Sequence, residues 1–265
     1  MHDLEKILRP KSIVLIGVSR KEGSLGKKFL DALLRMNFNG EIFIINPKAN
    51  EINGIPCYPS LSELEQKPDL AVILLPHQYV LDSLKELGEA GIKNVVVISS
   101  GFKEIGGEGI EREKQLIKIA NQYQMTLIGP NCMGIFNTDP KIRLNGTFSP
   151  ILPKAGHVAY ISQSGALAVA ILELTAQTDL GFSVFVSTGN KALVGEPEVL
   201  EFLKEDVNTN VVTLYLESID QPQSFMKACS SLVIKKPILA VKAGRTDSGQ
   251  KAATSHTGAL DNPEH

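Results

Sequence analysis

The chain has 265 residues, with 27 Lys or Arg against 29 Asp or Glu and a formal net charge of −2. This balance does not favour a nucleic-acid-binding protein, and neither a membrane-spanning apolar run nor an N-terminal secretory signal is present. The three cysteines are scattered without metal-ligand spacing, so we expect no metal site, reduced thiols and a cytoplasmic protein.

The first half of the chain alternates short apolar runs with amphipathic stretches. Strands are expected at residues 12–17, 41–46, 70–75, 94–99 and 125–129, and helices at 27–35, 78–90 and 109–123. Continuous apolar strands separated by helices are typical of a parallel α/β sheet that is covered on both faces. Ligands of such sheets lie at the carboxyl ends of the strands, so the loops there are the candidate sites.

The loop after the first strand has the composition of a phosphate-binding loop. Gly, Ser and a basic residue precede a helix start, where backbone N–H groups and the helix dipole favour an anion. The residues concerned are Gly17, Ser19, Arg20, Gly23, Ser24 and Gly26. The dinucleotide fingerprint G-x-G-x-x-G is absent, which disfavours NAD.

Lys48 follows the second strand, where NAD enzymes usually carry an acid that binds the ribose hydroxyls. A lysine suits a phosphate there, such as a 2′- or 3′-phosphate on the ribose; an ordinary surface lysine after Pro47 is the alternative.

The later strands of the first half also end in polar or small residues. The segments are Pro76-His77, Ser99-Ser100-Gly101-Phe102 and Gly129-Pro130-Asn131-Cys132-Met133-Gly134. We expect His77 to begin a helix rather than to catalyse. Cys132 is expected to be a packed or pocket-lining thiol, because no histidine can be paired with it as in a thiol nucleophile.

A second alternating series follows a segment whose composition predicts a linker over residues 137–156, with Pro140, Gly146, Pro150 and Pro153. Strands are expected at 157–161, 182–186, 211–216 and 238–241, and helices at 164–174, 197–204 and 223–233. This alternation predicts a second α/β domain, flavodoxin-like, over residues 157–265.

Three features of the second half point to phosphate chemistry. Ser164, Gly165 and Ala166 begin a helix and offer N–H groups to an anion, although Ser164 is equally an ordinary N-cap. His256 lies in a loop of small residues and can act as a nucleophile, unless it is an incidental surface histidine. Glu217 ends a strand and could orient that imidazole, or it is a solvated loop glutamate.

These motifs, in this order, resemble the nucleoside-diphosphate-forming acyl-CoA synthetases, a family related to the α subunit of succinyl-CoA synthetase. The resemblance covers nearly the whole chain. It is carried by Gly17-Val18-Ser19-Arg20, Asn46-Pro47-Lys48, Ser99-Ser100-Gly101-Phe102, Gly129-Pro130-Asn131-Cys132-Met133-Gly134, Tyr160-Ile161-Ser162-Gln163-Ser164-Gly165-Ala166-Leu167, Ser187-Thr188-Gly189-Asn190-Lys191-Ala192, Leu214-Tyr215-Leu216-Glu217 and Ser255-His256-Thr257-Gly258-Ala259-Leu260.

The resemblance implies that residues 1–136 form a Rossmann-like domain that binds coenzyme A. Lys48 would pair with a CoA phosphate, and the residues that would line the CoA phosphates are Gly17, Ser19, Arg20, Gly23, Ser24 and Gly26. Ser99, Ser100 and Gly101 would approach the pantetheine arm, with Asn131 near the thiol end. In the second domain, the helix start at Ser164 would hold inorganic phosphate, or the phosphoryl group carried by His256.

The implied activity is ADP-forming acid–CoA ligation: acyl-CoA, phosphate and ADP give the free acid, CoA and ATP, through an acyl phosphate and phospho-His256. The acid would be small, with acetate as the family default. No P-loop is present. The resemblance therefore implies that ADP or ATP with Mg²⁺ binds an ATP-grasp β-type partner subunit or domain, within an oligomer.

Two departures from the family pattern bear on these expectations. Leu193-Val194-Gly195 intervenes before Glu196, where family members carry more acids, so the acyl pocket is not defined. The sequence ends five residues after Leu260, which suggests a C-terminally truncated second domain. The alternative function is therefore a non-catalytic CoA-binding or CoA-sensing module that lacks the nucleotide-binding partner.

Overall fold

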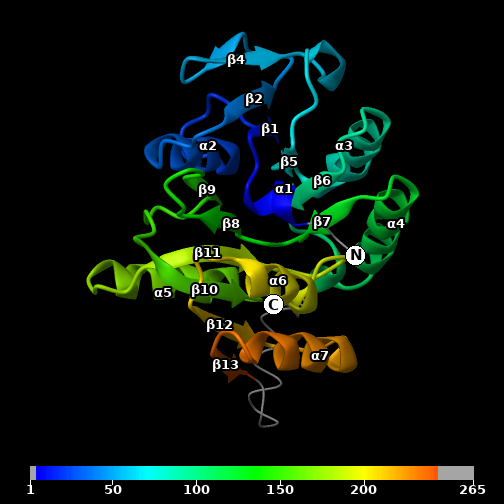
Figure 1. The fold of residues 1–265 in the computed structure, drawn as a ribbon. Coiled ribbons are helices and arrows are strands. Elements are labelled where there is room, and N and C mark those ends of the chain that lie inside the picture. The colour runs from blue at the N-terminus through cyan, green and yellow to red at the C-terminus, as the bar shows by residue number, and fades with distance from the viewer. Residues whose placement is uncertain (1–3, 244–265) are drawn as a thin grey trace, which may run out of the picture.

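The computed structural model describes residues 4–243, which form two stacked, mainly parallel sheets flanked by helices (Figure 1). The first sheet has seven strands in the order β3-β4-β2-β1-β5-β6-β7, and the second has six in the order β13-β12-β10-β11-β8-β9. The predicted α/β fold class, with its two successive parallel-rich parts, is confirmed. His256 lies outside the described residues.

The first sheet is built around β1, whose five residues are all buried. Its strands are β1 (Ser12–Ile16), β2 (Glu41–Ile45), β3 (Glu51–Ile52), β4 (Ile55–Tyr58), β5 (Leu70–Ile73), β6 (Asn94–Val97) and β7 (Thr126–Ile128). The helices are α1 (Glu5–Leu8), α2 (Leu25–Arg35), α3 (His77–Glu89) and α4 (Glu108–Gln122), with short 3₁₀ turns η1 (Leu61–Glu63) and η2 (Lys103–Ile105). β1 pairs in parallel with both β2 and β5. The later strands are therefore added on one side of β1 first and then on the other, so β1 lies at the switch point of the strand order.

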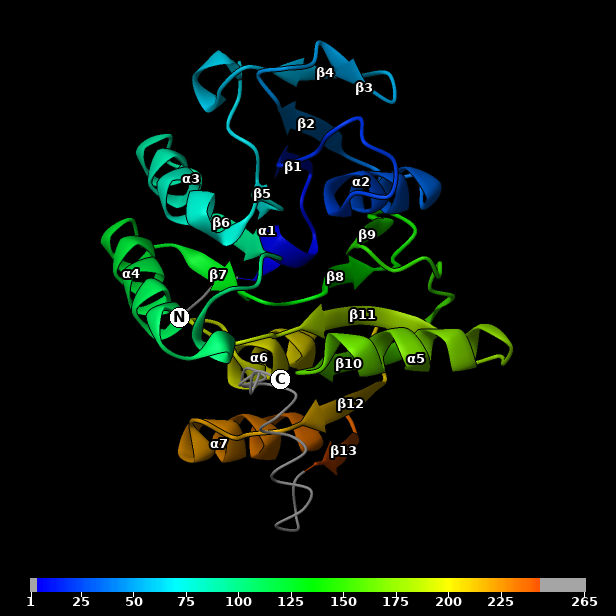
Figure 2. The same ribbon diagram turned by 180° about the vertical axis from the view of Figure 1, so that it is seen from behind.

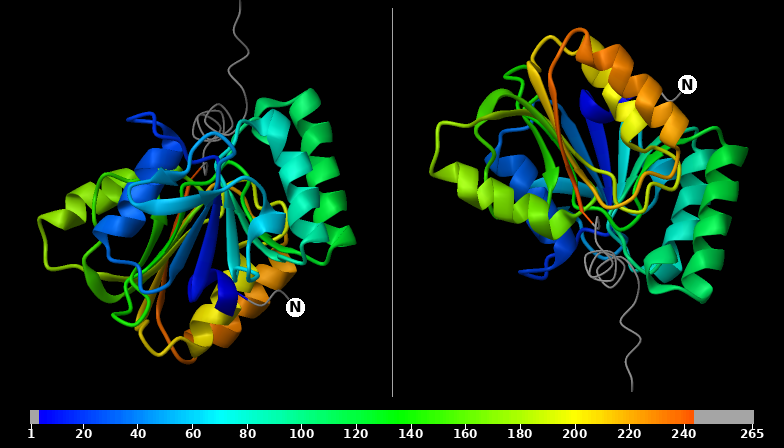
Figure 3. Two further views of the ribbon diagram at one scale, coloured as in Figure 1. Left: turned by 90° about the horizontal axis from the view of Figure 1, so that it is seen from above. Right: turned by 90° about the horizontal axis from the view of Figure 1, so that it is seen from below.

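The second sheet has β10 (Ala155–Ser162) at its centre, in parallel with β11 (Phe182–Ser187) and β12 (Val211–Leu216). β13 (Ile238–Lys242) pairs with β12 at the edge. The helices are α5 (Gly165–Ala176), α6 (Glu196–Glu205) and α7 (Pro222–Val233). Seen along the stack, α2 and α5 lie on one side of the molecule and α3 and α4 on the other (Figure 3).

The segment 137–156 is not the linker that its prolines and glycine predict. β8 (Gly134–Asn137) and β9 (Leu144–Thr147) form an antiparallel hairpin, and β8 joins β11, so the hairpin extends the second sheet. Both strands are fully buried and lie between α2 and β11 (Figure 2). A Cβ on Gly146 would lie 3.3 Å from the Phe29 ring of α2, so this glycine serves close packing rather than flexibility.

One hydrophobic core runs through both sheets. It joins side chains such as Leu15 and Leu30 of the first sheet layer to Ile135 of the hairpin and to Ile161 and Val186 of the second sheet. The two layers therefore pack on each other as one body. Within residues 4–243 no helix combines the length and the apolar character that crossing a membrane requires.

The loop after β11 docks on the loop after β7 by backbone contact. The N–H groups of Asn190, Ala192 and Val194 donate to the carbonyls of Pro130, Gly129 and Leu127 at 2.9, 3.0 and 3.1 Å. Gly189 has φ +56°, and a Cβ there would lie 2.3 Å from the Pro130 oxygen. Only glycine fits, because the backbones touch at this point.

We therefore expect Gly189→Ala to lower the free energy of unfolding by about 3 kcal/mol, from left-handed strain plus the steric overlap. Gly54→Ala is the matched control, because Gly54 also has positive φ, of +77°, but nothing lies within 4 Å of its Cβ position. It should cost only about 1 kcal/mol. Urea unfolding of the two variants and the parent chain measures the difference; equal losses would contradict the close contact.

Candidate functional site

The loop after β1 closes tightly on the neighbouring strand and helix. Gly17 has φ +105°, and a Cβ there would lie 2.8 Å from the Leu74 carbonyl carbon. A Cβ on Gly26, in the first turn of α2, would lie 2.4 Å from the Gly17 oxygen. The helix N-terminus and the loop thus approach each other as closely as backbones allow, at a helix start whose N–H groups favour an anion.

The structure brings the polar residues of this loop together with the end of β2. The Ser19 and Ser24 hydroxyls are 3.3 Å apart, and Ser24 caps α2 by accepting from the Lys27 N–H. Arg20 Nη2 donates to the Lys48 carbonyl at 3.4 Å, so the two basic residues of the predicted phosphate site are neighbours. Gly23, with φ +74°, lies in the turn that precedes Ser24.

Asn46 holds these two loops in place, a role that its sequence position alone does not show. Its Nδ2 donates to the Val18 carbonyl at 2.8 Å, and its Oδ1 accepts from the Lys48 N–H at 2.8 Å. An Asx turn of this kind fixes the residue two positions later, which is Lys48.

The residues after β6 differ in burial: Ser99 is buried, whereas Ser100 is exposed. Ser99 is 5% exposed and donates to the Leu75 carbonyl, so its hydroxyl joins the ends of β5 and β6. Ser100 is exposed, and Gly101 has φ +102°. A Cβ on Gly101 would lie 2.6 Å from His77 Nδ1, so the imidazole covers this glycine. His77 is the first residue of α3, as expected.

Asn131 stands where the two sheets meet. Its Nδ2 donates to Asn190 Oδ1 at 3.3 Å across the interface. The Asn190 Nδ2 in turn donates to Glu104 at 2.6 Å and to the buried Glu113 at 2.7 Å. Glu104 also accepts from the Gly101 and Phe102 N–H groups. The Asn190 side chain therefore links the loop after β6, the loop after β7 and the loop after β11.

The helix start at Ser164 lies beside the Asn131 loop. Ser164 is the N-cap of α5, 7% exposed, and accepts from the Leu167 N–H at 3.3 Å. Gly165 and Ala166 occupy the first turn, whose N–H groups have no partner within the helix. A Cβ on Gly165 would lie 3.4 Å from the Met133 Cβ, and Met133 follows Asn131 by two residues. The predicted phosphate site and the predicted thiol end of the CoA site are thus adjacent.

Glu217 directly follows β12, next to the residue that precedes Ser164. Its N–H donates to Gln163 Oε1 at 2.7 Å, and its carbonyl accepts from Lys242 Nζ at 2.8 Å. The structure therefore brings Glu217 to the same edge of the second sheet as Ser164, Gly165 and Ala166. Gln163 belongs to the motif Tyr160–Leu167, but the sequence alone does not indicate that its side chain binds the backbone of Glu217.

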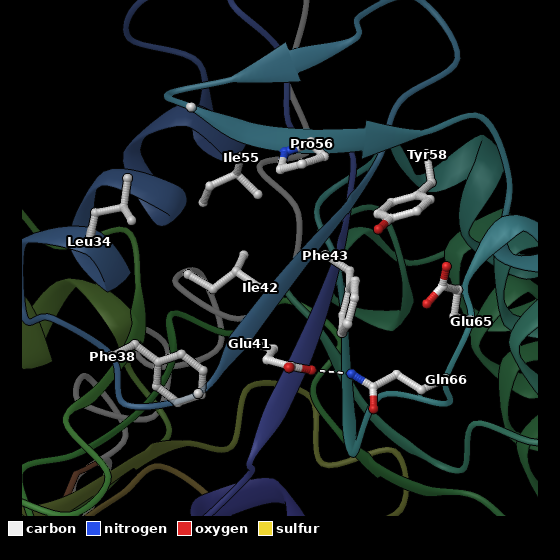
Figure 4. A pocket seen from close by; sticks show the side chains of 12 residues that line it. Leu34, Phe38, Glu41, Ile42, Phe43, Ile55, Pro56, Tyr58, Glu65 and Gln66 are labelled. Atoms are coloured by element: carbon white, nitrogen blue, oxygen red, sulfur yellow. Dashed lines mark hydrogen bonds between the residues drawn. The ribbon is translucent and has the colours of Figure 1, made fainter.

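A separate hollow of about 800 Å³ lies at the amino end of β2, between β2 and β4 (Figure 4). It is lined by apolar side chains, including Ile42, Phe43 and Ile55, and by Glu41 and Glu65. β2 and β4 pair only at Ile44–Cys57 and Ile45–Tyr58. Continuing this register would require an N–H from Pro56, which proline lacks. None of the predicted site residues within 4–243 lines this hollow.

Comparison with known proteins matches two family models to this chain. The CoA binding domain matches residues 11–138, and the succinyl-CoA ligase like flavodoxin domain matches residues 155–265. The acetate–CoA ligase [ADP-forming] I of Archaeoglobus fulgidus is 42% identical over 257 residues, which are 97% of this chain and 37% of that protein.

Two further relatives match over almost the whole chain. The acetate–CoA ligase [ADP-forming] I subunit alpha of Pyrococcus furiosus is 41% identical over 97% of this chain and 56% of its own length. A solved structure of dinucleotide-forming acetyl-coenzyme A synthetase 1 of Ca. Korarchaeum cryptofilum, in complex with phosphate and ADP, superposes with a TM-score of 0.92 at 41% identity. The superposition covers 99% of this chain and 56% of the synthetase chain. The chain thus spans 37% to 56% of the length of these three relatives.

Burial makes the Cys132 thiol a poor nucleophile. Its side chain is 5% exposed and donates to the Val97 carbonyl at 3.3 Å, and desolvation raises its pKa to about 12. We expect iodoacetamide at pH 8 to leave Cys132 unmodified in the folded chain and to alkylate it in urea, because only the thiolate reacts. Peptide mass spectrometry reads out each cysteine; the half-buried Cys57 and Cys229 serve as internal controls. Alkylation of native Cys132 at the rate seen in urea would contradict this assignment.

Proposed function

Since this chain belongs to the family of ADP-forming acyl-CoA synthetase α-type chains, related to the α subunit of succinyl-CoA synthetase, we propose that it performs the CoA-binding and phosphate-transfer steps of such an enzyme. The overall reaction is the reversible conversion of acyl-CoA, phosphate and ADP to the free acid, CoA and ATP. The observation that carries the proposal is the adjacency of the α5 N-terminus and the Asn131 loop.

In this proposal the edge of the first sheet binds CoA. Gly17, Ser19, Gly23, Ser24 and Gly26 surround the phosphates at the α2 N-terminus. Arg20 and Lys48, which lie side by side, supply positive charge for these phosphates. Gly101 and the exposed Ser100 border the path of the pantetheine arm. Ser99 contributes by joining β5 to β6, and Asn131 lies at the thiol end.

The chemistry follows from the contact between the two sites. A phosphate oxygen attacks the thioester carbonyl carbon, and the CoA thiolate leaves, which gives an acyl phosphate. A ring nitrogen of His256 then attacks the phosphorus and releases the carboxylate. The first-turn N–H groups of Gly165 and Ala166, at the helix start that Ser164 caps, stabilise the phosphoryl oxygens, and Glu217 orients the imidazole and stabilises its positive charge. Positioning and electrostatics do most of the work in such transfers.

The last step, transfer from phospho-His256 to ADP, takes place on a partner. We propose an ATP-grasp β-type subunit or domain that holds ADP or ATP with Mg²⁺, within an oligomer. The names of two relatives support this assignment: one is an alpha subunit and the other was solved with phosphate and ADP. Acetate or another small acid is the proposed substrate, in a cytoplasm that keeps the three free cysteines reduced.

The central test is phosphoryl uptake. The chain, with acetyl-CoA and radiolabelled inorganic phosphate, should acquire acid-labile label that is absent from His256→Ala. His157→Ala is the matched control, because His157 is exposed at the amino end of β10, away from the Ser164 edge. Label that persists in His256→Ala would overturn the proposed relay. CoA binding without any label, with or without a partner subunit, would indicate the binding-module alternative instead.

A second test addresses Lys48. If Lys48 binds the 3′-phosphate of CoA, Lys48→Ala should weaken CoA binding about tenfold, the loss of one charge-assisted hydrogen bond. It should leave 3′-dephospho-CoA binding unchanged. Lys118→Ala on the exposed face of α4 is the control and should bind both ligands normally. Titration calorimetry at one fixed salt concentration measures the affinity of the parent chain and of both variants for each ligand; equal losses for both ligands in Lys48→Ala would remove Lys48 from the 3′-phosphate.

A further inference from the structure

The amide of Gln163 lies at the junction of three loops at the carboxyl edge of the second sheet. Its Nε2 donates to Glu196 Oε1 and to the Ser218 carbonyl, both at 2.8 Å. Its Oε1 accepts from the Glu217 N–H at 2.7 Å and from the Ser218 N–H at 2.9 Å. Both donors and both lone pairs of this amide are used.

The surroundings of Glu196 fix the orientation of this amide. Glu196 is 4% exposed, and its Oε1 also accepts from Thr188 Oγ1 at 3.2 Å. A carboxylate acceptor requires the nitrogen of the amide on its side, so the oxygen must face the backbone N–H groups. Glu196 begins α6 and therefore does not shift independently of the helix.

Lys191 reinforces the same junction from the loop after β11. Its side chain is 8% exposed, and its Nζ lies 3.0 Å from Asp220 and 3.8 Å from Glu196. It also donates to the Ser218 hydroxyl at 3.0 Å. Lys191 has φ +57°, a conformation that L-residues other than glycine adopt at a cost and that persists only where contacts hold it.

The junction has a consequence for the phosphate site, because Gln163 immediately precedes the N-cap of α5. Its own N–H donates to the Tyr215 carbonyl at 3.2 Å, while its side chain holds the backbone of Glu217 and Ser218. Gln163 thus sets the distance between the α5 N-terminus and Glu217. Its backbone N–H contacts the end of β12, and its side-chain amide contacts the two residues that follow β12.

We propose that Gln163 is a positioning residue that sets the separation between the phosphate-binding start of α5 and the Glu217 carboxylate. The proposal rests on the proposed function of those two elements. It assigns no contact between Gln163 and substrate. Its effect on phosphoryl transfer comes through Glu217, which must face the histidine while the helix start faces the phosphoryl oxygens.

The test compares Gln163→Met with Gln177→Met, which changes an exposed glutamine at the C-cap of the same helix. In the full chain with acetyl-CoA and radiolabelled phosphate, we expect Gln163→Met to label His256 about tenfold more slowly, equivalent to about 1.4 kcal/mol in the barrier. The phosphate concentration for half-maximal labelling should rise, and CoA affinity should stay within about twofold of the parent chain. Gln177→Met should match the parent chain in all three measurements.

An exchange of partners makes the test independent of simple loss of stability. Gln163→Glu places a carboxylate against Glu196 and should slow labelling at least as much as Gln163→Met. Combining it with Glu196→Gln restores the donor–acceptor pair between the two side chains at the same total charge, although not the bond to the Ser218 carbonyl, so the double variant should label faster than Gln163→Glu alone. A merely structural defect in each single variant would add in the double variant instead of cancelling.

Hydrogen exchange of the peptide around Glu217 gives a reading that needs no activity. Gln163→Met should speed exchange of the Glu217 and Ser218 N–H groups, whereas Gln177→Met should not. Normal labelling by Gln163→Met, with or without faster exchange, would overturn the positioning role while leaving the proposed function intact. Absence of label in both the parent chain and Gln177→Met would instead overturn the proposed function, and this inference with it.

Discussion

The backbone contact between the loops after β7 and β11 is the constraint on which the rest of the site depends. Three N–H groups of residues 190–194 donate to carbonyls of residues 127–130, so the second sheet's loop pairs with the end of the first sheet. Each bond contributes only about 1 kcal/mol net. Together they fix the relative position of two carboxyl edges that come from different sheets. In the proposed function, this fixed position is what brings the CoA site on one edge next to the phosphate site on the other.

The side chain of Asn190 adds hydrogen bonds to this backbone contact between the two loops. Its amide donates to two carboxylates, Glu104 and Glu113, and its carbonyl oxygen accepts from Asn131. Lys103 Nζ lies 3.4 Å from Glu113, so the buried acid also has a positive neighbour. Burying an unpartnered carboxylate would cost several kcal/mol. The network therefore favours one arrangement of the loops over others, which a purely apolar contact would not do.

The sequence was sufficient to predict most of the fold, because the informative patterns were strong. Continuous apolar strands such as 12–17 and 94–99 and the helices between them were confirmed, as was the resemblance to the acyl-CoA synthetase family. The β8–β9 hairpin was missed because proline and glycine usually indicate a linker, whereas Gly146 is there to admit Phe29. The β3–β4 hairpin was also missed, although Asn53-Gly54 is a common signal for a two-residue turn.

The candidate site was predictable only in part, for a physical reason. Loops at the carboxyl ends of parallel strands are brought together by topology, so Gly17, Lys48, Ser164 and Glu217 could be placed at sheet edges from the strand pattern. The residues that hold those loops, Asn46, Gln163 and Asn190, act through side-chain amides, each with at least one partner that is distant in sequence. Such bonds leave no periodic pattern, and an amide in a motif reads equally as a ligand or as a support.

The described residues also indicate what the proposed reaction still requires. Within residues 4–243 the histidines are His77, which covers Gly101 in the first sheet layer, and His157, whose ring Nδ1 donates to the Asn208 carbonyl at 2.9 Å. His157 begins at the amino end of β10, the opposite end of that strand from Ser164. Neither of these two therefore provides an imidazole at the α5 start. Phosphoryl transfer through a histidine at this edge thus needs a ring from outside residues 4–243, which is the role proposed for His256. In the proposed reaction, Gln163 and Asn190 would then hold the loops around the α5 start in place while the phosphoryl group passes to His256.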